Sequence, residues 1–496
     1  MNHRERSAVA PWKLLLTLLA AFTLLAAACG DSDDDSDAGD DSSASASEPA
    51  ETTDASDDGG DDTETTEASD DGGDDAGGDR SINVAIVGNP HMENIATLTP
   101  ELFTADTGIE VNYTFLEEQT LREIVTRDVG AGGDQFDVVM IGMFEAPQFG
   151  NNGWLYDLNE FAADTPEWNG DDIIPAVRGG LSFEGSLYAA PFYAESSFLM
   201  YRQDVLDEAG LTMPDAPTWD EVAEIARAVD SDEMAGICLR GKPGWGDLGA
   251  SFTTVLNTFG GTWWLANDDG SIGEAQVDQP EFREALEFYI GLVNDAGQDD
   301  AANASFNECL SLYQNGQVSM WYDATVAAGL LEADDSPVAG LNNFALAPTN
   351  VTDASGWLWS WALAIPQNSS DPDTAWEYVA WATGPEYLLE QAPAALSGGW
   401  PAVPPGTRQS LYENADYLAS SAAFAEPTLA AMLAAPIDNP GTTPRPGLPG
   451  VQYVGVPEFQ DVGTRCTEQF SAAIAGSTSI DDALSACQAI ASQVSN

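Results

Sequence analysis

The residues of this chain that could recognise a small ligand are acids, amides and aromatic rings at the ends of predicted strands. The run Pro191–Tyr201 is apolar and aromatic except for one carboxylate, Glu195. A strand this apolar is normally buried on both faces, and a buried carboxylate has to be paired or hydrogen-bonded. Two interpretations follow. Glu195 either points to solvent at a strand end, or faces a ligand cleft from a strand that crosses between two lobes.

A second group lies in the turn Gly236–Trp245, where a predicted strand leads to Arg240, Lys242 and Trp245 on a Gly/Pro loop. Two cations and an indole in one rigid turn suit hydrogen bonding and stacking, although a salt-bridged surface turn is the alternative. Further along, Asp323 ends a strand just before a helix begins. It could face the same ligand or simply cap that helix.

The strand Trp357–Ile365 carries three indoles on one face, because Trp357, Trp359 and Trp361 alternate with period two. Three indoles on one face usually belong to a core. In a chain with this many polar strand ends, they could instead form a platform for the flat apolar face of a sugar.

The elements that must position these side chains alternate between strand and helix. The predicted strands Ser81–Asn89, Ile109–Leu116 and Phe136–Ile141 are separated by predicted helices at Met92–Thr107 and Gln119–Gly130. This spacing predicts βαβ units and a parallel sheet. Ligands of open α/β sheets bind beyond the carboxyl ends of the strands, so we expect a cleft there. The side chains at these strand ends are Asn89, Glu117, Glu118 and Phe144.

The first 80 residues are predicted to be an export signal and a tether. Residues 1–28 have a basic start and the apolar run Leu14–Leu25, which is too short for a stable membrane span. The segment Leu25–Gly30 resembles the bacterial lipobox, which implies cleavage before Cys29 and lipidation of its thiol. An ordinary signal peptide cut nearby is the alternative. Residues 29–80 are acidic and poor in apolar side chains, which predicts a disordered linker.

Composition limits the classes of partner and the number of lobes. The chain has 82 Asp and Glu against 15 Lys and Arg, a formal net charge of −67. This charge argues against nucleic acid or an anionic membrane surface as partner. The part that follows the tether is too long for one hydrophobic core, which favours two lobes.

Four cysteines remain if Cys29 is lipidated, and an even number in an exported protein predicts two disulfides. Of the three possible pairings we favour Cys238–Cys309 and Cys466–Cys487, because each closes a loop within one predicted lobe. A metal site is the alternative. The spacings do not match zinc motifs and the chain has only 2 His, so we expect neither a metal nor a cofactor.

From Ile82 to its end the chain resembles the family-one extracellular solute-binding proteins of ABC importers, and within them the mannitol/sorbitol (polyol)-binding group. The polyol assignment depends mainly on the stretches Arg240–Trp245, Asp323 and Trp357–Trp361. The matching segments, in chain order, are Gly133–Pro147, Leu187–Arg202, Gly236–Asp247, Thr253–Trp264, Met320–Leu331, Trp357–Pro366, Gly398–Ser410 and Gly455–Thr464.

The resemblance implies a maltose-binding-like (type II) periplasmic-binding-protein fold: two α/β lobes of mixed sheets flanked by helices, with the ligand in the cleft between them. Lobe one is expected at 81–191 and 327–365, and lobe two at 195–323 and 366–496. Glu195 and Asp323 match positions that face the cleft in relatives. Met143 and Phe144 stand where close polyol-binding relatives tend to carry Asn and Tyr, which leaves the exact ligand open.

The resemblance therefore implies a monomeric substrate-binding lipoprotein on the outer face of the cytoplasmic membrane. It would capture a sugar alcohol of the mannitol, sorbitol or arabitol type, or a related sugar, and deliver it to the permease. The alternatives are a protein that binds a mono- or oligosaccharide, a secreted glycoside hydrolase with paired carboxylates, and a surface adhesin. The expected ligand-binding residues are Asn89, Glu118, Phe144, Glu195, Arg240, Lys242, Trp245, Asp323, Trp359 and Trp361.

Overall fold

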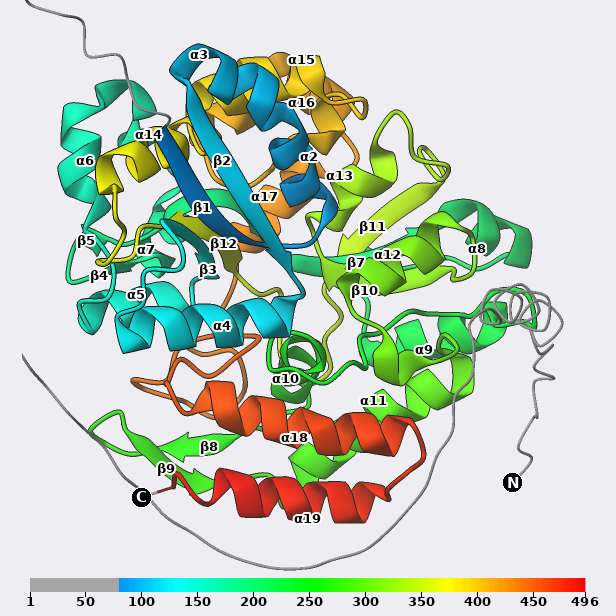
Figure 1. Ribbon diagram of the computed structural model, residues 1–496. Helices are drawn as coiled ribbons and strands as arrows, with labels where there is room; N and C mark the ends of the chain where they lie inside the picture. Colours follow the sequence, from blue (N-terminus) through cyan, green and yellow to red (C-terminus); the bar gives the residue numbers. More distant parts are fainter. Residues whose placement is uncertain (1–79, 496) are drawn as a thin grey trace, which may run out of the picture. The chain divides into compact units, whose positions relative to one another are not determined.

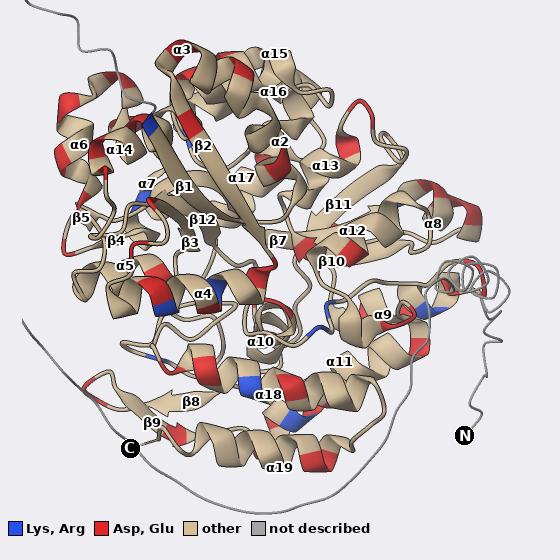
Figure 2. Ribbon diagram, viewed as in Figure 1, with Lys and Arg blue, Asp and Glu red and all other residues tan. Residues whose placement is uncertain are grey.

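The structure is a computed structural model that describes residues 80–495 (Figure 1). The predicted signal peptide, the lipidated Cys29 and nearly all of the acidic linker lie outside the described residues. Within 80–495, no helix is both long enough and apolar enough to cross a membrane. Asp and Glu are spread over nearly all of the helices, with few Lys and Arg among them (Figure 2).

A mixed five-stranded sheet with the order β2-β1-β3-β12-β6 forms one half of the fold. β1 pairs in parallel with β2 and β3, which confirms the predicted parallel βαβ units at the start of the fold. β12 runs antiparallel to both β3 and β6, and this makes the sheet mixed. The five strands are β1 (Arg80–Val87), β2 (Ile109–Leu116), β3 (Val138–Gly142), β6 (Ala190–Glu195) and β12 (Trp359–Ala364).

A second, antiparallel sheet has the order β10-β7-β11, built from β7 (Ser197–Arg202), β10 (Met320–Ala324) and β11 (Asn342–Leu346). β6 and β7 follow each other in the chain but belong to different sheets. The chain therefore passes from one sheet to the other at Ser196, inside the predicted strand Pro191–Tyr201.

Helices cover both sheets. The connections within the first sheet are made by α2 (Pro90–Thr99), which continues through η1 and α3 to Gly108, and by α4 (Glu118–Ala131). Four other helices, α10 (Leu248–Thr258), α11 (Pro280–Ala296), α18 (Phe459–Ile474) and α19 (Ile480–Ala491), pack against one another (Figure 1). The remaining elements are η1 (Pro100–Thr104), α3 (Ala105–Thr107), α5 (Glu145–Asn151), α6 (Leu158–Asp164), η2 (Pro166–Trp168), η3 (Gly170–Asp172), α7 (Pro175–Gly180), β4 (Ser182–Phe183), β5 (Ser186–Leu187), α8 (Gln203–Ala209), α9 (Trp219–Val229), α10 (Leu248–Thr258), β8 (Trp264–Ala266), β9 (Ile272–Ala275), α11 (Pro280–Ala296), η4 (Ala301–Asn303), α12 (Phe306–Gln314), α13 (Ala327–Glu332), α14 (Pro372–Ala382), η5 (Tyr387–Gln391), α15 (Ala392–Ala395), η6 (Trp400–Ala402), η7 (Gln409–Glu413), α16 (Ala415–Ser420), α17 (Ala425–Leu433), α18 (Phe459–Ile474) and α19 (Ile480–Ala491).

Two segments pack differently from the division into lobes that the sequence suggested. β11 lies within 327–365, yet it pairs with β7 of the three-stranded sheet. α14 lies within 366–496, yet it contacts β1 and β6 of the five-stranded sheet. Its Trp376 packs edge-on against Trp168, with ring centroids 5.2 Å apart. The helix is amphipathic, but its sequence does not reveal which sheet its apolar face covers.

The two disulfides have the favoured pairing, which confirms that prediction. Cys238 and Cys309 are bonded with a Cα–Cα distance of 5.7 Å, and Cys466 and Cys487 join α18 to α19 with a Cα–Cα distance of 4.8 Å. All four cysteines are fully buried.

The loop lengths of the two disulfides predict different contributions to stability. Loop-closure entropy predicts about 4 kcal/mol for the Cys238–Cys309 bond and about 3 kcal/mol for the Cys466–Cys487 bond. We expect the double substitution Cys238→Ala/Cys309→Ala to lower the free energy of unfolding by more than Cys466→Ala/Cys487→Ala. Urea denaturation of both variants measures this. The reverse order would show that native packing, rather than loop length, sets the contribution of each bond.

Candidate functional site

Two adjoining cavities lie where strands of the five-stranded sheet end. The first, of about 80 Å³, is lined mostly by polar side chains, and we call it the polar cavity. The second, of about 30 Å³, is lined by Trp245, Trp357 and Trp359, and we call it the indole cavity. The residues that line both cavities are Glu118, Glu195, Arg240 and Trp361.

Most of the expected ligand-binding residues line these cavities. Asn89 and Lys242 line the polar cavity, and Trp245 and Trp359 line the indole cavity, in addition to the four residues common to both. The structure therefore gathers strand ends that are up to some 270 residues apart in sequence, as expected for open α/β sheets.

Phe144 and Asp323 lie behind the lining residues. The Phe144 ring packs against Trp245, with ring centroids 4.5 Å apart. Asp323 is fully buried and binds the guanidinium of Arg240. Both residues thus act on the site through a neighbour.

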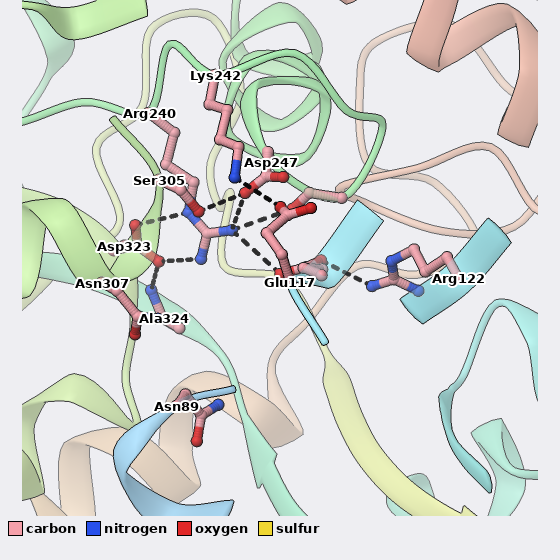
Figure 3. Close-up of polar contacts among 12 residues, drawn as sticks. Asn89, Glu117, Arg122, Arg240, Lys242, Asp247, Ser305, Asn307, Asp323 and Ala324 are labelled. Carbon is pink, nitrogen blue, oxygen red and sulfur yellow. Dashed lines mark hydrogen bonds and ion pairs between the residues drawn. The ribbon is translucent and has the colours of Figure 1, made fainter. Parts of the chain in front are cut away.

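Arg240 is held in place by a bidentate ion pair with Asp323. Its Nε donates to Asp323 Oδ2 at 2.8 Å and its Nη2 donates to Asp323 Oδ1 at 2.6 Å (Figure 3). Its Nη1 donates to the Gly246 carbonyl at 3.0 Å and lies 3.9 Å from carboxylate oxygens of Glu118 and Asp247. Burial alone would lower the pKa of Arg240, but the charge of Asp323 holds it well above the usual value. The guanidinium is therefore charged and fixed beside both cavities.

A second buried arginine, Arg122, organises the indoles. Its Nη2 donates to Glu118 Oε1 at 2.8 Å, and its Nη1 donates to Glu145. The guanidinium carbon lies 4.2 Å from the ring centroid of Trp245, with two further indoles at similar distances. These are cation–π contacts, which are strong when desolvated.

Sequence reasoning missed Arg122. The available signal was its position four residues after Glu118 on a predicted helix, where an ion pair is favoured.

The indoles do not form a flat platform, so that interpretation is wrong. The rings of Trp359 and Trp361 meet edge to face with an interplanar angle of 84°, and Trp245 meets Trp359 at 72°. Edge-to-face packing around the Arg122 cation explains these angles, since ring edges are positive and ring faces are negative. The indoles therefore enclose a narrow space.

Glu195 faces the cavities and not bulk solvent. Its side chain is buried, with 5% of the residue exposed, and it lines both cavities. Burial raises the pKa of the Glu195 carboxyl well above its usual range, although the charge of Arg240 opposes this. Within residues 80–495 its Oε2 has no hydrogen-bond partner. The interpretation of Glu195 as a solvent-facing strand end is wrong.

The edge of the polar cavity is closed by two direct contacts. Lys242 Nζ donates to Glu117 Oε1 at 2.7 Å, and Asn307 Nδ2 donates to the Gly88 carbonyl at 2.8 Å. Each contact joins the end of a strand of the five-stranded sheet to a segment that packs with the three-stranded sheet. Lys242, expected to bind ligand, thus has a partner of its own.

Several lining residues were not among the expected set, and Trp357 and Gln452 of the indole cavity are two of them. Trp357 belongs to the series of alternating indoles and could have been included on that ground. Gln452 lies in a loop after a Pro/Gly-rich stretch, and no local pattern marks it as a binding residue.

Two separate sheets flanked by helices, a chain segment that crosses between them and two adjoining cavities at the strand ends are typical of a two-lobe binding protein. The family model "Bacterial extracellular solute-binding protein" matches residues 89–388. The chain therefore belongs to the family of bacterial extracellular solute-binding proteins.

Individual relatives agree with this assignment. A mannitol-binding protein of Pseudomonas aeruginosa is 39% identical over 419 residues, which is 83% of this chain and 92% of that protein. An ABC transporter solute-binding protein from Agrobacterium vitis S4, solved with bound D-mannitol, shares 44% identity with a TM-score of 0.79. The match covers 84% of this chain and 98% of that chain. A maltose-bound protein from T. maritima, at 22% identity and a TM-score of 0.68, shows the maltose-binding-like fold.

Asp247 is a second buried acid beside the cavities. It is fully buried and accepts a hydrogen bond of 2.5 Å from the Ser305 hydroxyl. Burial, together with the charge of Glu118, raises the pKa of the Asp247 carboxyl to about 7, although Arg240 opposes this. The folded protein therefore keeps this proton to a higher pH than the unfolded chain does.

This retained proton predicts a pH-dependent stability. A raised pKa in the folded state contributes stability that is fully present below the unfolded pKa and is lost as pH rises through the folded pKa. We expect wild type to lose roughly 1–4 kcal/mol relative to Asp247→Asn as pH rises from about 4 to about 7. Urea denaturation of both proteins across this range measures the difference. A difference that stays constant with pH would contradict the shift at Asp247.

Proposed function

We propose that this chain is the substrate-binding protein of an ABC importer and that it captures a linear sugar alcohol of the mannitol, sorbitol or arabitol type. The observation that carries the proposal is the pair of cavities in which the Glu195 carboxyl and the charged Arg240 guanidinium adjoin the indoles. The likeness to a mannitol-binding protein and to a mannitol-bound structure supports it.

The chemistry of the lining suits a polyol. A polyol carries hydroxyl groups, each a donor and an acceptor, along a thin carbon chain. Arg240 and Asn89 can donate to these hydroxyls, and Glu118 can accept from them, at roughly 1.5–3 kcal/mol for each bond to a charged group. Trp361 lines both cavities and covers the carbon chain between the hydroxyls.

The volumes favour a single small molecule over an oligosaccharide. A water-sized group takes about 10–15 Å³ in this measure, so the two cavities together hold about seven to eleven such groups. A pentitol or hexitol has about ten to twelve non-hydrogen atoms, whereas a disaccharide has about twice as many. A monosaccharide remains the alternative ligand.

The pairing of the acids argues against a glycoside hydrolase. That chemistry needs two carboxyl groups free to act on either side of one bond. Here Asp323 is bound to Arg240, and Glu118 and Glu145 are bound to Arg122. The relatives are named as binding proteins. We therefore infer that the chain binds its ligand without turnover.

Delivery of the ligand to the permease depends on closure of the two lobes around it. Ligand contacts on both sides of the cavities stabilise the closed form over an open one, and the permease would recognise the closed form. Lipidation at Cys29 and the acidic segment 29–80 would hold this monomeric receptor on the outer face of the cytoplasmic membrane.

Titration calorimetry tests the ligand class. We expect heats of binding with mannitol, sorbitol or arabitol, with glucose and maltose as the cyclic comparisons. Absence of binding to all three polyols would contradict the proposed function. A thermal shift assay with the same compounds gives an independent readout, since a ligand that binds only the folded state raises the melting temperature.

Arg240 gives a sharper test of the site. We expect Arg240→Lys to lower polyol affinity by about tenfold or more, because an ammonium group cannot reproduce the fork of the guanidinium, while its charge still pairs with Asp323. Asp323→Ala should instead lower the free energy of unfolding by about 3–5 kcal/mol, because it leaves a buried cation unpaired. Unchanged polyol affinity in Arg240→Lys would contradict a ligand-binding role for Arg240.

The Lys242–Glu117 contact predicts an effect on ligand release. The pair is partly exposed, so removing it with Glu117→Gln should weaken closure by only about 0.2–1 kcal/mol. We expect the dissociation rate of the polyol to rise about 1.5- to 5-fold, measured by stopped-flow tryptophan fluorescence. Arg465→Met, which removes an exposed pair within α18, is the matched control. If both variants release ligand at the same rate, the contact does not hold the cavity closed.

A further inference from the structure

Buried polar atoms without partners gather around the indole cavity. Among the described residues, they include Glu195 Oε2, Trp245 Nε1, Trp357 Nε1 and Gln452 Oε1, and all four side chains line this cavity of about 30 Å³. The Trp357 indole lies near enough to the Glu195 carboxyl to favour its charged form, but the two make no hydrogen bond of ordinary length and angle. Buried polar atoms in native proteins are nearly always hydrogen-bonded, so a cluster of unpaired ones needs a physical explanation.

In the polar cavity, by contrast, several polar side chains are hydrogen-bonded within the protein. There Lys242 is bonded to Glu117, Asn307 to the Gly88 carbonyl, and Asn89 Nδ2 to the Tyr193 hydroxyl at 3.2 Å. Those side chains already have partners within the protein. Of the four side chains with unpaired atoms, only Glu195 also lines the polar cavity, so the unpaired atoms of the site gather in the indole cavity, where a ligand would complete them.

The unpaired atoms match a hydroxyl group. Two of them are indole N–H donors and two are oxygens, and a hydroxyl donates one hydrogen bond and accepts up to two. A purely apolar group in this cavity would leave all four atoms unpaired, and an anion without a hydrogen to donate would leave the two oxygens unpaired. A neutral ligand that carries hydroxyls satisfies both the donors and the oxygens.

The surrounding structure fixes these atoms in position. Gln452 Nε2 donates to the Leu358 carbonyl at 3.1 Å, which leaves Gln452 Oε1 free to accept. The Trp357 ring packs edge-on against Tyr322, with centroids 6.1 Å apart. Trp245 is held between Phe144 and the Arg122 guanidinium. Preorganised groups of this kind give affinity and selectivity without further ordering.

The volume limits what can enter. At about 10–15 Å³ for each water-sized group, about 30 Å³ holds two or three such groups. The end of an open-chain polyol, a hydroxymethyl group and the next carbon, has this size, whereas a pyranose ring is wider. Glu195, Arg240 and Trp361 line both cavities, so one linear molecule can extend from one cavity into the other.

We propose that the indole cavity binds the terminal hydroxyl of an open-chain polyol, and that Trp357 and Gln452 select for this end. The proposal rests on the proposed function and adds to it the part of the site that distinguishes an open chain from a ring. Trp357 donates to the terminal hydroxyl and Gln452 Oε1 accepts from it. Glu195 and Trp245 bind the neighbouring hydroxyl of the same end.

The test combines a change in the protein with a change in the ligand. The proteins are wild type, Trp357→Phe and Gln452→Met, and the ligands are D-mannitol and 1,6-dideoxy-D-mannitol, compared by titration calorimetry. Both terminal hydroxyls are removed because the two ends of mannitol are equivalent. We expect wild type to prefer mannitol by about tenfold or more, and each variant to bind mannitol about tenfold more weakly. Neither variant should change the affinity for the dideoxy compound by more than about twofold.

Three results would overturn the proposal. They are unchanged mannitol affinity in both variants, equal loss of affinity for both ligands, and a wild type that binds the two ligands equally. Failure of wild type to bind any polyol would instead overturn the proposed function, and it is observed before any variant is measured. The two failures are therefore distinguishable.

Trp219→Phe is the matched control. Trp219, the first residue of α9, also has a buried Nε1 without a partner among residues 80–495. Its ring packs against Phe288 and against Tyr322, which also contacts Trp357, and Trp219 lines neither cavity. We expect this variant to keep its mannitol affinity within about twofold. A loss equal to that of Trp357→Phe would show an effect of repacking and overturn the assignment of Trp357.

Discussion

The site depends on the neutralisation of one buried cation. A guanidinium removed from water is strongly destabilising unless a carboxylate and further acceptors surround it. Arg240 meets this requirement with Asp323 of β10 and the carbonyl of Gly246, while Glu118 of α4 lies nearby. These groups come from both halves of the fold, so the electrostatic requirement also determines how the strand ends and the Gly236–Asp247 turn approach each other.

The charged and the aromatic parts of the site are linked through Glu118. One of its oxygens binds Arg122, and the other lies 3.9 Å from Arg240. Arg122 in turn holds the indoles by cation–π contacts and thereby sets their edge-to-face angles. The shape of the indole cavity thus follows from the position of a charge. This explains why an aromatic surface that could have been flat encloses a narrow space.

The sequence predicted the features that local pattern encodes. The strand ends follow from alternation, and the disulfide pairing follows from loop closure within the predicted lobes. The crossing at Pro191–Tyr201 and the inward Glu195 were one of two interpretations of that run, and the family resemblance favoured them. Arg122 and Gln452 were missed, because their roles depend on partners far away in sequence. The same reason applies to α14, whose apolar face is visible in the sequence although its partner sheet is not. The mutual angles of the indoles likewise depend on a cation that their own strand does not carry.

Lys242 is the only lysine after residue 13, and it stands at the edge of the polar cavity with 31% of its side chain exposed. Residues 80–495 therefore carry a single side-chain amine, at a place where the proposed closure around a ligand would change its surroundings. Reductive methylation with isotope-labelled formaldehyde keeps the positive charge and would put one nuclear magnetic resonance probe there without any substitution. The labelled Lys242 would thus report the conformational equilibrium of the protein in its natural sequence.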